Sequence, residues 1–388
     1  MIKKSLLAGL TCSTLIFLAF SDKAQAVNMT ASYGATVLAT GLANPRGVTV
    51  DAQGNVYVAE SGTGGAGPCI GTRCYGTTGS IGVYNMNTMN YSHVITGLAS
   101  LAGSSGDDAA GISDLTFDAA GNLYGVIGFG GGPADLNTLG PLGEQFGKVM
   151  SFSSPSAPNI STLADISGYQ FSNNITNSNP YSLASDGNGG FYVTDAGANN
   201  LVKAASDGSV STLVSFPDDP NTGMQAVPTG VAVGPDNNPY IGQLTGFPFP
   251  TGGANVFTVD QTNTLQTFAT GFTTITDVSF GPDGSLYVLE YSTDFFTNPQ
   301  GSIWQIQTDG TKNLIYTDPS LINPTGLFVQ DSDTIFVTNK GPSGTDGELL
   351  VLSTSIDSLS TPEPSTVVSL ATLGLLSAYS LKRRTGKK

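Results

Sequence analysis

The sequence predicts an all-β protein made of six similar sheets. The 388 residues include 50 glycines and 21 prolines, which disfavour long helices because glycine loses most entropy on ordering and proline breaks the hydrogen-bond ladder. Hydrophobic residues make up 39% of the chain, enough for a buried core. Six segments repeat one plan: an apolar strand flanked by Gly or Pro, a tight polar turn, and a second strand with an aromatic residue. Together these observations predict a six-bladed β-propeller.

The aromatic residue of the second strand marks each repeat. The first copy is NPRGVTVDAQGNVYVAE, and the fifth is ITDVSFGPDGSLYVLE. Successive aromatic positions lie 67, 68, 48, 47 and 49 residues apart, and the last three spacings match the period of about 40–50 residues typical of propeller blades. A β-sandwich is the structural alternative, but it gives no reason for six equal units. The aromatic positions are Tyr57, Tyr124, Tyr192, Tyr240, Tyr287 and Phe336.

Each unit continues with two more strands, so that a blade has four. The third strands alternate apolar residues, as in GSIGVYN, and the fourth strands are of the type YSHVITGL. The sixth unit lacks a fourth strand, whereas residues 36–42, TVLATGL, precede the first unit without a partner. We expect this N-terminal strand to complete the last blade in a 3+1 closure, because pairing there removes an open sheet edge.

Loop lengths predict which face of the propeller binds a ligand or partner. The turns inside each hairpin, such as DAQGN and GPDGS, are short and lie on one face. The longer connections fall on the opposite face, which we call the long-loop face, and long loops on a rigid scaffold often carry binding residues. These segments are 61–78, 99–110, 128–146, 217–226, 244–253 and 291–300, and the aromatic residues expected to be exposed there are Phe129, Phe247, Phe249, Phe295 and Phe296.

Polar residues end the second strands on the long-loop face. Carboxylates and amides are oxygen ligands of the kind that Ca²⁺ prefers. The alternative is structural, because an Asp or Glu that ends a strand often accepts hydrogen bonds from backbone N–H groups of the next loop. The six occupants are Glu60, Ile127, Asp195, Gln243, Glu290 and Asn339, and the predicted metal ligands among them are Glu60, Asp195, Glu290 and Asn339.

The first residues of the innermost strands line the mouth of the central channel. Their side chains would suit a small polar or aromatic ligand. They would equally bridge one another across a water-filled channel, because buried polar groups need partners. The channel positions are Arg46, Asp114, Tyr181, Thr229, Asp277 and Thr325, and the predicted ligand-binding residues are Arg46, Asp114, Tyr181 and Asp277.

Charge and cysteine content narrow the function classes. Residues 27–361 hold 6 basic and 27 acidic residues, a net charge of −21, which disfavours nucleic-acid binding. Cys69 and Cys74 lie close together in the sequence, and in an oxidising compartment they favour a local disulfide. Zinc is disfavoured because His93 is the only histidine. No catalytic residues are predicted, since the sequence contains neither Gly-x-Ser-x-Gly nor HExxH.

Both chain ends have the composition of targeting segments. Residues 1–26 combine a basic start, an apolar run and an Ala-Gln-Ala site, which is typical of a secretory signal peptide. Residues 27–357 are the predicted propeller domain. The last segment, 358–388, contains an apolar stretch expected to form a transmembrane helix, followed by a basic end. A Pro-Glu-Pro triplet precedes that stretch, at Pro362, Glu363 and Pro364.

The order of triplet, apolar helix and basic tail resembles the PEP-CTERM sorting signal of Gram-negative bacteria and cyanobacteria. This resemblance implies an exosortase as the sorting partner and a transient anchor in the inner membrane. It implies export to the periplasm, the outer envelope or the extracellular space. The alternative is a plain C-terminal anchor, which would also leave the propeller outside the cytoplasm.

The stretches ATGLANPRGVTVDAQGNVYVAESGTGG and GISDLTFDAAGNLYGVIGFGG carry a second resemblance. They are similar to NHL-type propellers and, more closely, to the ScyD/ScyE family, extracytoplasmic propellers named from cyanobacterial scytonemin biosynthesis clusters. The resemblance implies a non-enzymatic binding or scaffold protein allied to pigment assembly, with a small molecule or an envelope protein as its partner. It brings no catalytic residues.

A second hypothesis comes from a different class of function. Six-bladed propellers of the gluconolactonase type are metal-dependent hydrolases, in which Glu, Asn and Asp hold a Ca²⁺ ion in the channel. The predicted metal ligands of this sequence are similar in type. The binding hypothesis needs no cofactor, whereas the hydrolase hypothesis needs Ca²⁺ and makes the protein an enzyme.

Overall fold

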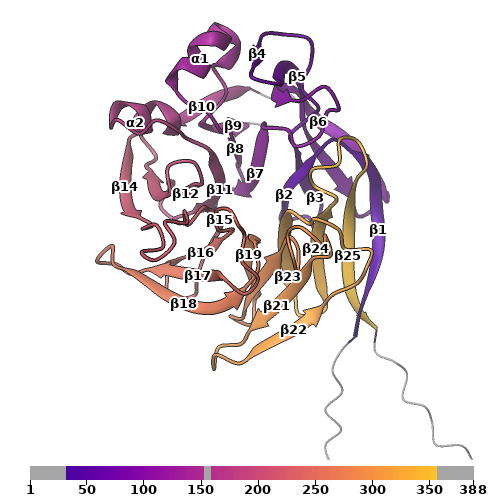
Figure 1. Ribbon diagram of the computed structural model, residues 1–388. Helices are drawn as coiled ribbons and strands as arrows, with labels where there is room; N and C mark the ends of the chain where they lie inside the picture. Colours follow the sequence, from indigo (N-terminus) through magenta and orange to yellow (C-terminus); the bar gives the residue numbers. More distant parts are fainter. Residues whose placement is uncertain (1–31, 153–158, 356–388) are drawn as a thin grey trace, which may run out of the picture. The chain divides into compact units, whose positions relative to one another are not determined.

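Five of the six sheets are four-stranded and antiparallel, and the sheet of the first repeat has a fifth, short strand. The computed structural model describes residues 32–152 and 159–355, and its six sheets, numbered here as blades 1 to 6 from the first repeat, surround a common centre (Figure 1). The innermost strands contact one another in cyclic order, which confirms an all-β six-bladed propeller. These strands are β2 (Pro45–Val50), β7 (Ile112–Phe117), β11 (Pro180–Ser185), β15 (Pro228–Val233), β19 (Ile275–Phe280) and β23 (Gly326–Asp331).

The outer strands follow in chain order, except in blade 6. The second strands are β3 (Val56–Glu60), β8 (Leu123–Ile127), β12 (Phe191–Asp195), β16 (Pro239–Gln243), β20 (Leu286–Glu290) and β24 (Thr334–Asn339). The third strands are β5 (Arg73–Asn85), β9 (Lys148–Phe152), β13 (Asn200–Ala204), β17 (Ala254–Val259), β21 (Ser302–Ile306) and β25 (Gly347–Ser355). The fourth strands are β6 (Asn90–Ala102), β10 (Ile160–Asp165), β14 (Val210–Ser215), β18 (Leu265–Phe272), β22 (Lys312–Tyr316) and, in blade 6, β1 (Ser32–Leu42).

The N-terminal strand closes the ring, as predicted. Strand β1 pairs antiparallel with β25, so that Ser32 lies opposite Ser355 and Leu42 lies opposite Gly347. The strand begins earlier than the predicted residue 36, and Leu42 at its end is buried in the core between blades 6 and 1. The last blade therefore joins the two ends of the described chain, and β25 is paired on both of its sides.

The repeated aromatic residues pack between neighbouring blades, which explains why the repeat needs them. The ring of Tyr57 in blade 1 meets Phe117 of blade 2 edge to face, with 5.2 Å between centroids. Tyr240 of blade 4 meets Phe280 of blade 5 in the same way at 5.0 Å. An aromatic ring is large enough to fill the space between two twisted sheets and gains more from burial than an aliphatic side chain.

The insertions of the long-loop face contain structure that the sequence did not predict. The helices α1 (Pro133–Leu139) and α2 (Ile166–Ser172) and a 3₁₀ turn (Gly140–Gly143) are short, and strand β4 (Cys69–Ile70) adds a hairpin to β5. Helices of seven residues carry too weak a periodicity to be recognised among Gly and Pro. The expectation that Phe129 is exposed is wrong: its ring is fully buried and packs against Phe146 at 5.6 Å.

The predicted targeting segments lie outside the described residues. These are the signal peptide at 1–26 and the sorting signal at 358–388, which includes the Pro-Glu-Pro triplet. Within residues 32–152 and 159–355, no helix is long and apolar enough to cross a membrane.

Candidate functional site

Each of the four predicted metal ligands accepts a hydrogen bond from the backbone of its own blade. In every case a side-chain oxygen at the end of the second strand accepts a hydrogen bond from a backbone N–H just before the innermost strand. The bonds run from Ala43 to Glu60 (2.7 Å), from Asn179 to Asp195 (2.7 Å), from Thr273 to Glu290 (2.6 Å) and from Ile322 to Asn339 (2.8 Å). This geometry fixes the path by which the chain enters each blade.

Further partners occupy the remaining oxygens. Asp195 also accepts hydrogen bonds from the Ser178 hydroxyl and from the N–H groups of Gly197 and Ala198. Glu290 accepts from the Ser302 hydroxyl and from the Trp304 indole N–H at 2.9 Å.

Glu60 is hydrogen-bonded to two side chains of β6, the fourth strand of blade 1. It accepts from the Tyr91 hydroxyl at 2.7 Å and is hydrogen-bonded to His93 Nε2 at 2.8 Å. In the part of the chain that the structure describes, no three His, Cys, Asp or Glu side chains are grouped to hold a metal ion. The structure thus leaves the four predicted metal ligands in four separate blades.

The predicted channel residues do come together, and they tie the blades to one another. Asp114 on β7 accepts hydrogen bonds from the Ser182 hydroxyl (2.6 Å) and the Leu183 N–H (3.0 Å) of β11 in the next blade. Asp277 on β19 accepts from the Leu327 N–H of β23 at 2.7 Å. Each carboxylate therefore bridges two adjacent innermost strands.

The two channel threonines have the same bridging role. The hydroxyl of Thr229 donates to the Ile275 carbonyl of the next blade at 2.7 Å. The hydroxyl of Thr325 donates to the Pro45 carbonyl at 2.7 Å, across the seam between blades 6 and 1. These bonds satisfy buried polar groups at the inner ends of the blades.

Glycines let the innermost strands approach the channel carboxylates closely. A Cβ atom on Gly47 would lie 2.0 Å from Asp114 Oδ1, and one on Gly230 would lie 2.5 Å from Asp277 Oδ1. Any side chain at these two positions would displace the carboxylate. The first strands of blades 1 and 4 therefore require glycine opposite the acidic residue of the following blade.

Burial sets the protonation of the channel. It raises the pKa of Asp114 to about 6, although hydrogen bonds from Ser182 and Leu183 favour the ionised form. Burial and then the negative charge of Asp114 raise the pKa of Asp277 well above its ordinary value. Burial also raises the pKa of Tyr181, which interacts electrostatically with Arg46 and with both carboxyl groups. The four predicted ligand-binding residues therefore share one electrostatic environment.

The raised pKa of Asp114 predicts a pH-dependent stability. The folded protein keeps this proton up to about pH 6, whereas an unfolded Asp releases it near pH 4. Between these values the folded state binds more protons, so the unfolding free energy falls as the pH rises. We expect the stability of Asp114→Asn relative to the wild-type protein to rise by about 2 kcal/mol between pH 4 and pH 7, measured by denaturant unfolding.

Asp118→Asn is the matched control for this measurement. Burial works against ionisation of Asp118, but hydrogen bonds from Asn122 and neighbouring backbone groups outweigh it and lower the pKa. The stability of this variant relative to the wild-type protein should stay constant between pH 5 and pH 7. A flat profile for Asp114→Asn would contradict the assignment of a protonated channel carboxyl.

A cavity of about 540 Å³ opens above the channel on the long-loop face. Three of the predicted channel residues contribute to its wall, together with long-loop residues that the repeat pattern did not single out. Asp114 and Asp277 are not among the lining residues. The walls include Arg46, Arg73, Asn179, Tyr181, Tyr291 and Phe295.

Arg46 reaches the cavity with donors to spare. Its side chain is only 14% exposed, and Nη2 donates to the Ala109 carbonyl at 3.3 Å. Its ion-pair partner Asp108 lies 3.6 Å away and is almost fully exposed at the rim. A guanidinium has five N–H donors, and the described residues give it one hydrogen bond and one long ion pair. The other donors remain for solvent or a ligand.

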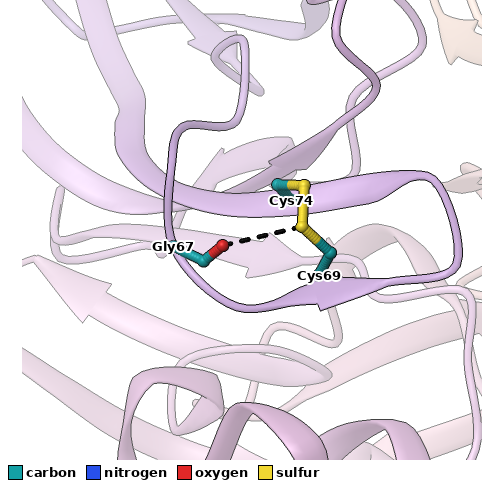
Figure 2. The surroundings of a disulfide bond; sticks show 3 residues. All are labelled: Gly67, Cys69 and Cys74. Atoms are coloured by element: carbon teal, nitrogen blue, oxygen red, sulfur yellow. Dashed lines mark hydrogen bonds between the residues drawn. A yellow bond between two sulfur atoms is a disulfide. The ribbon is translucent and has the colours of Figure 1, made fainter.

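Arg73 is held in place by the disulfide-linked hairpin. Cys69 and Cys74 form a disulfide in which they occupy paired positions of β4 and β5 (Figure 2). The next pair along the hairpin is Ile70 with Arg73, so the crosslink restrains the backbone that carries the guanidinium. Arg73 Nη2 donates to the Gly130 carbonyl of the blade 2 insertion at 2.9 Å.

Comparisons with known proteins support the fold and leave the family open. No protein-family model and no curated protein sequence matches the chain. Among solved structures, a putative gluconolactonase has a TM-score of 0.53 at 12% identity, over 86% of this chain and 97% of that one. A gluconolactonase from Xanthomonas campestris has a TM-score of 0.50 at 12% identity, over 83% and 90%. A calcium-binding protein, regucalcin, from Agrobacterium tumefaciens has 0.51 at 11%, over 84% and 96%.

These solved structures share the propeller architecture with this chain. At sequence identities of 11% to 12%, the similarity shows the fold but does not allow site residues to be transferred to this chain.

Proposed function

We propose that the protein binds a small organic anion, such as a carboxylate, in the cavity above the channel. One observation carries the proposal: residues 27–361 contain two arginines, Arg46 and Arg73, and both line this cavity. In a segment of net charge −21, random placement would scatter them over the surface. Arginine is suited to this role because its planar fork can donate two parallel hydrogen bonds to a carboxylate.

The environment of Arg46 strengthens its attraction for an anion. Arg46 is mostly withdrawn from solvent, and a partly enclosed site screens charge less than bulk water does. Burial and the charge of Asp114 raise the pKa of Asp277, which reduces the tendency of this channel carboxyl to carry a negative charge that would oppose an anion. The acidic outer surface repels anions elsewhere, which leaves the cavity as the favoured place for a negative group.

Titration with benzoate and with its neutral analogue benzamide tests the proposal. We expect benzoate to bind the wild-type protein and benzamide to bind much more weakly. Arg46→Ala should weaken benzoate binding about 30-fold, which corresponds to losing a charge-assisted hydrogen bond of about 2 kcal/mol. Calorimetry or ligand-observed NMR would measure both affinities.

Two variants serve as controls. Arg46→Lys keeps the charge but loses the fork and should give an intermediate affinity. Lys203→Ala removes a positive charge whose partner is Asp186, 2.9 Å away at a hairpin turn of blade 3, and should leave binding unchanged. Equal affinity for benzoate and benzamide, or equal loss in Arg46→Ala and Lys203→Ala, would refute a specific anion site.

A calcium-dependent hydrolase of the gluconolactonase type is the second candidate function. Solved structures whose names include gluconolactonase and a calcium-binding protein share this fold. The donor set fits the ion poorly, because all four predicted ligands accept backbone N–H groups. Both channel carboxylates also accept backbone N–H groups. Unfolding of the wild-type protein and of Asp195 variants with and without Ca²⁺ distinguishes this candidate.

We also propose that the protein is exported and sorted through its C-terminal segment. The basic, apolar and small-residue pattern at 1–26 and the triplet followed by an apolar stretch and basic tail at 358–388 support this. A binding role allied to pigment assembly is proposed on the ScyD/ScyE resemblance. Mass spectrometry of the native protein tests the export: we expect a chain that begins at Val27, whereas an intact N-terminus would rule out signal cleavage.

A further inference from the structure

We propose that the ligand of this cavity is an amphipathic anion whose apolar or aromatic body rests on a shelf of phenylalanine rings at the cavity edge. This inference rests on the proposed anion site and adds the chemistry of the rest of the ligand. The aromatic shelf consists of Phe247, Phe249, Phe295 and Phe296, which lie on the connections 244–253 and 291–300 of blades 4 and 5.

The shelf continues the wall of the cavity. Tyr291 and Phe295 both line the cavity, and their rings are stacked with centroids 6.0 Å apart. Phe295 then stacks on Phe249 at 4.0 Å with an angle of 26°. Phe296 contacts Phe295 edge to face at 5.3 Å, and Phe247 contacts Phe296 at 6.2 Å. The rings therefore form one apolar path from the cavity to the surface.

The outer end of the path is open to solvent. The side chains of Phe247 and Phe296 are 76% and 63% exposed. Among the described residues they are two of the most exposed large hydrophobic side chains, and they touch each other. Adjacent exposed rings beside a cavity mark a surface that gains free energy when an apolar group covers it.

The two loops hold the rings in place. The Asp294 carboxylate accepts the N–H groups of Phe296 (3.1 Å) and Thr297 (3.0 Å). The N–H of Phe249 donates to the Gly246 carbonyl at 2.9 Å, and Gly246 donates in turn to Gln225. A surface with its backbone already ordered loses little entropy when a ligand binds.

The positions of the two arginines and of the aromatic shelf indicate the kind of ligand that fits. Arg46 and Arg73 belong to blade 1, whereas the shelf belongs to blades 4 and 5 across the ring. A ligand that uses both ends needs a negative group at one end and an apolar body that reaches the opposite side. This arrangement favours a small aromatic or hydrophobic acid over a short anion or a sugar.

Comparing benzoate with biphenyl-4-carboxylate tests the shelf, because the two probes differ only by an added phenyl ring. We expect the longer probe to bind the wild-type protein about tenfold more tightly, the usual effect of one or two aromatic contacts. The double variant Phe247→Ala/Phe296→Ala should lose this difference and keep its affinity for benzoate. Phe268→Ala, which truncates a 42% exposed ring on β18 away from the cavity, is the matched control and should keep the difference.

The outcomes separate this inference from the proposed function. If benzoate binds and depends on Arg46 but the added ring gains nothing, the shelf is refuted and the anion site stands. If neither carboxylate binds, the anion site fails and the shelf inference fails with it. If the double variant loses binding to phosphatidylcholine vesicles while the probe difference persists, the shelf contacts a membrane and the ligand inference is overturned.

Discussion

Removal of the N-terminal strand should abolish the cooperative folding of the propeller. Deleting residues 32–42 takes away the partner of β25 and the buried side chain of Leu42. The deletion leaves an open edge in blade 6 and uncovers the core between blades 6 and 1. We expect a loss of more than about 5 kcal/mol, comparable with the whole stability of an ordinary domain. Loss of the cooperative thermal transition, followed by circular dichroism, would show it.

The structure offers a control that keeps the strand and changes only its connectivity. Ser32 lies opposite Ser355 at the end of the β1–β25 ladder, so a short turn can join these positions. A circular permutant linked there, and opened in the turn at residues 205–209, should fold and melt close to the wild-type temperature. The milder variant Leu42→Ala should cost about 3 kcal/mol. A deletion that still melts cooperatively within a few degrees of the wild-type protein would contradict the role of β1 in ring closure.

The sequence predicted the blades well because their residues are fixed by a repeated physical requirement. Every blade needs an apolar strand on each side of a tight turn and an aromatic ring to fill the gap to its neighbour, as Tyr57 does against Phe117. The last residue of the second strand was accordingly predicted correctly in all six blades. The insertions do not repeat, so the sequence offers no pattern to compare between blades. The sequence therefore did not predict the helices α1 and α2, strand β4 or the burial of Phe129.

The site was predicted only where its residues lie at positions that repeat from blade to blade. Channel positions recur at the start of each innermost strand, so Arg46, Asp114, Tyr181 and Asp277 could be identified by alignment of the repeats. Arg73 lies in a non-repeated insertion, and no spacing pointed to it. The one available signal was compositional: it is the second of two arginines in an acidic segment, and it adjoins a cysteine of the disulfide. For the strand-end residues, the structure confirms the structural alternative, because each of the four accepts a hydrogen bond from a backbone N–H group.

The strand-end carboxylates should matter for stability whether or not calcium is present. Asp195 is fully buried and accepts four hydrogen bonds, three of them from the backbone N–H groups of Asn179, Gly197 and Ala198. Asp195→Ala would leave these buried donors without a partner. We expect a loss of about 4 kcal/mol, since each unsatisfied buried group costs about 1–3 kcal/mol. Denaturant unfolding in EDTA and in millimolar Ca²⁺ would measure this loss under both conditions.

Asp195→Asn is the conservative comparison, because the amide oxygen can still accept the backbone N–H groups. We expect it to retain most of the stability that Asp195→Ala loses, with the same difference in EDTA and in Ca²⁺. Calcium held by this side chain would instead stabilise the wild-type protein by about 2.7 kcal/mol at a hundred times its Kd, and both variants would lose that gain. The backbone-cap interpretation thus predicts no response to added Ca²⁺, whereas the hydrolase hypothesis predicts stabilisation. An Asp195 oxygen that already accepts three N–H groups has little capacity left for a cation.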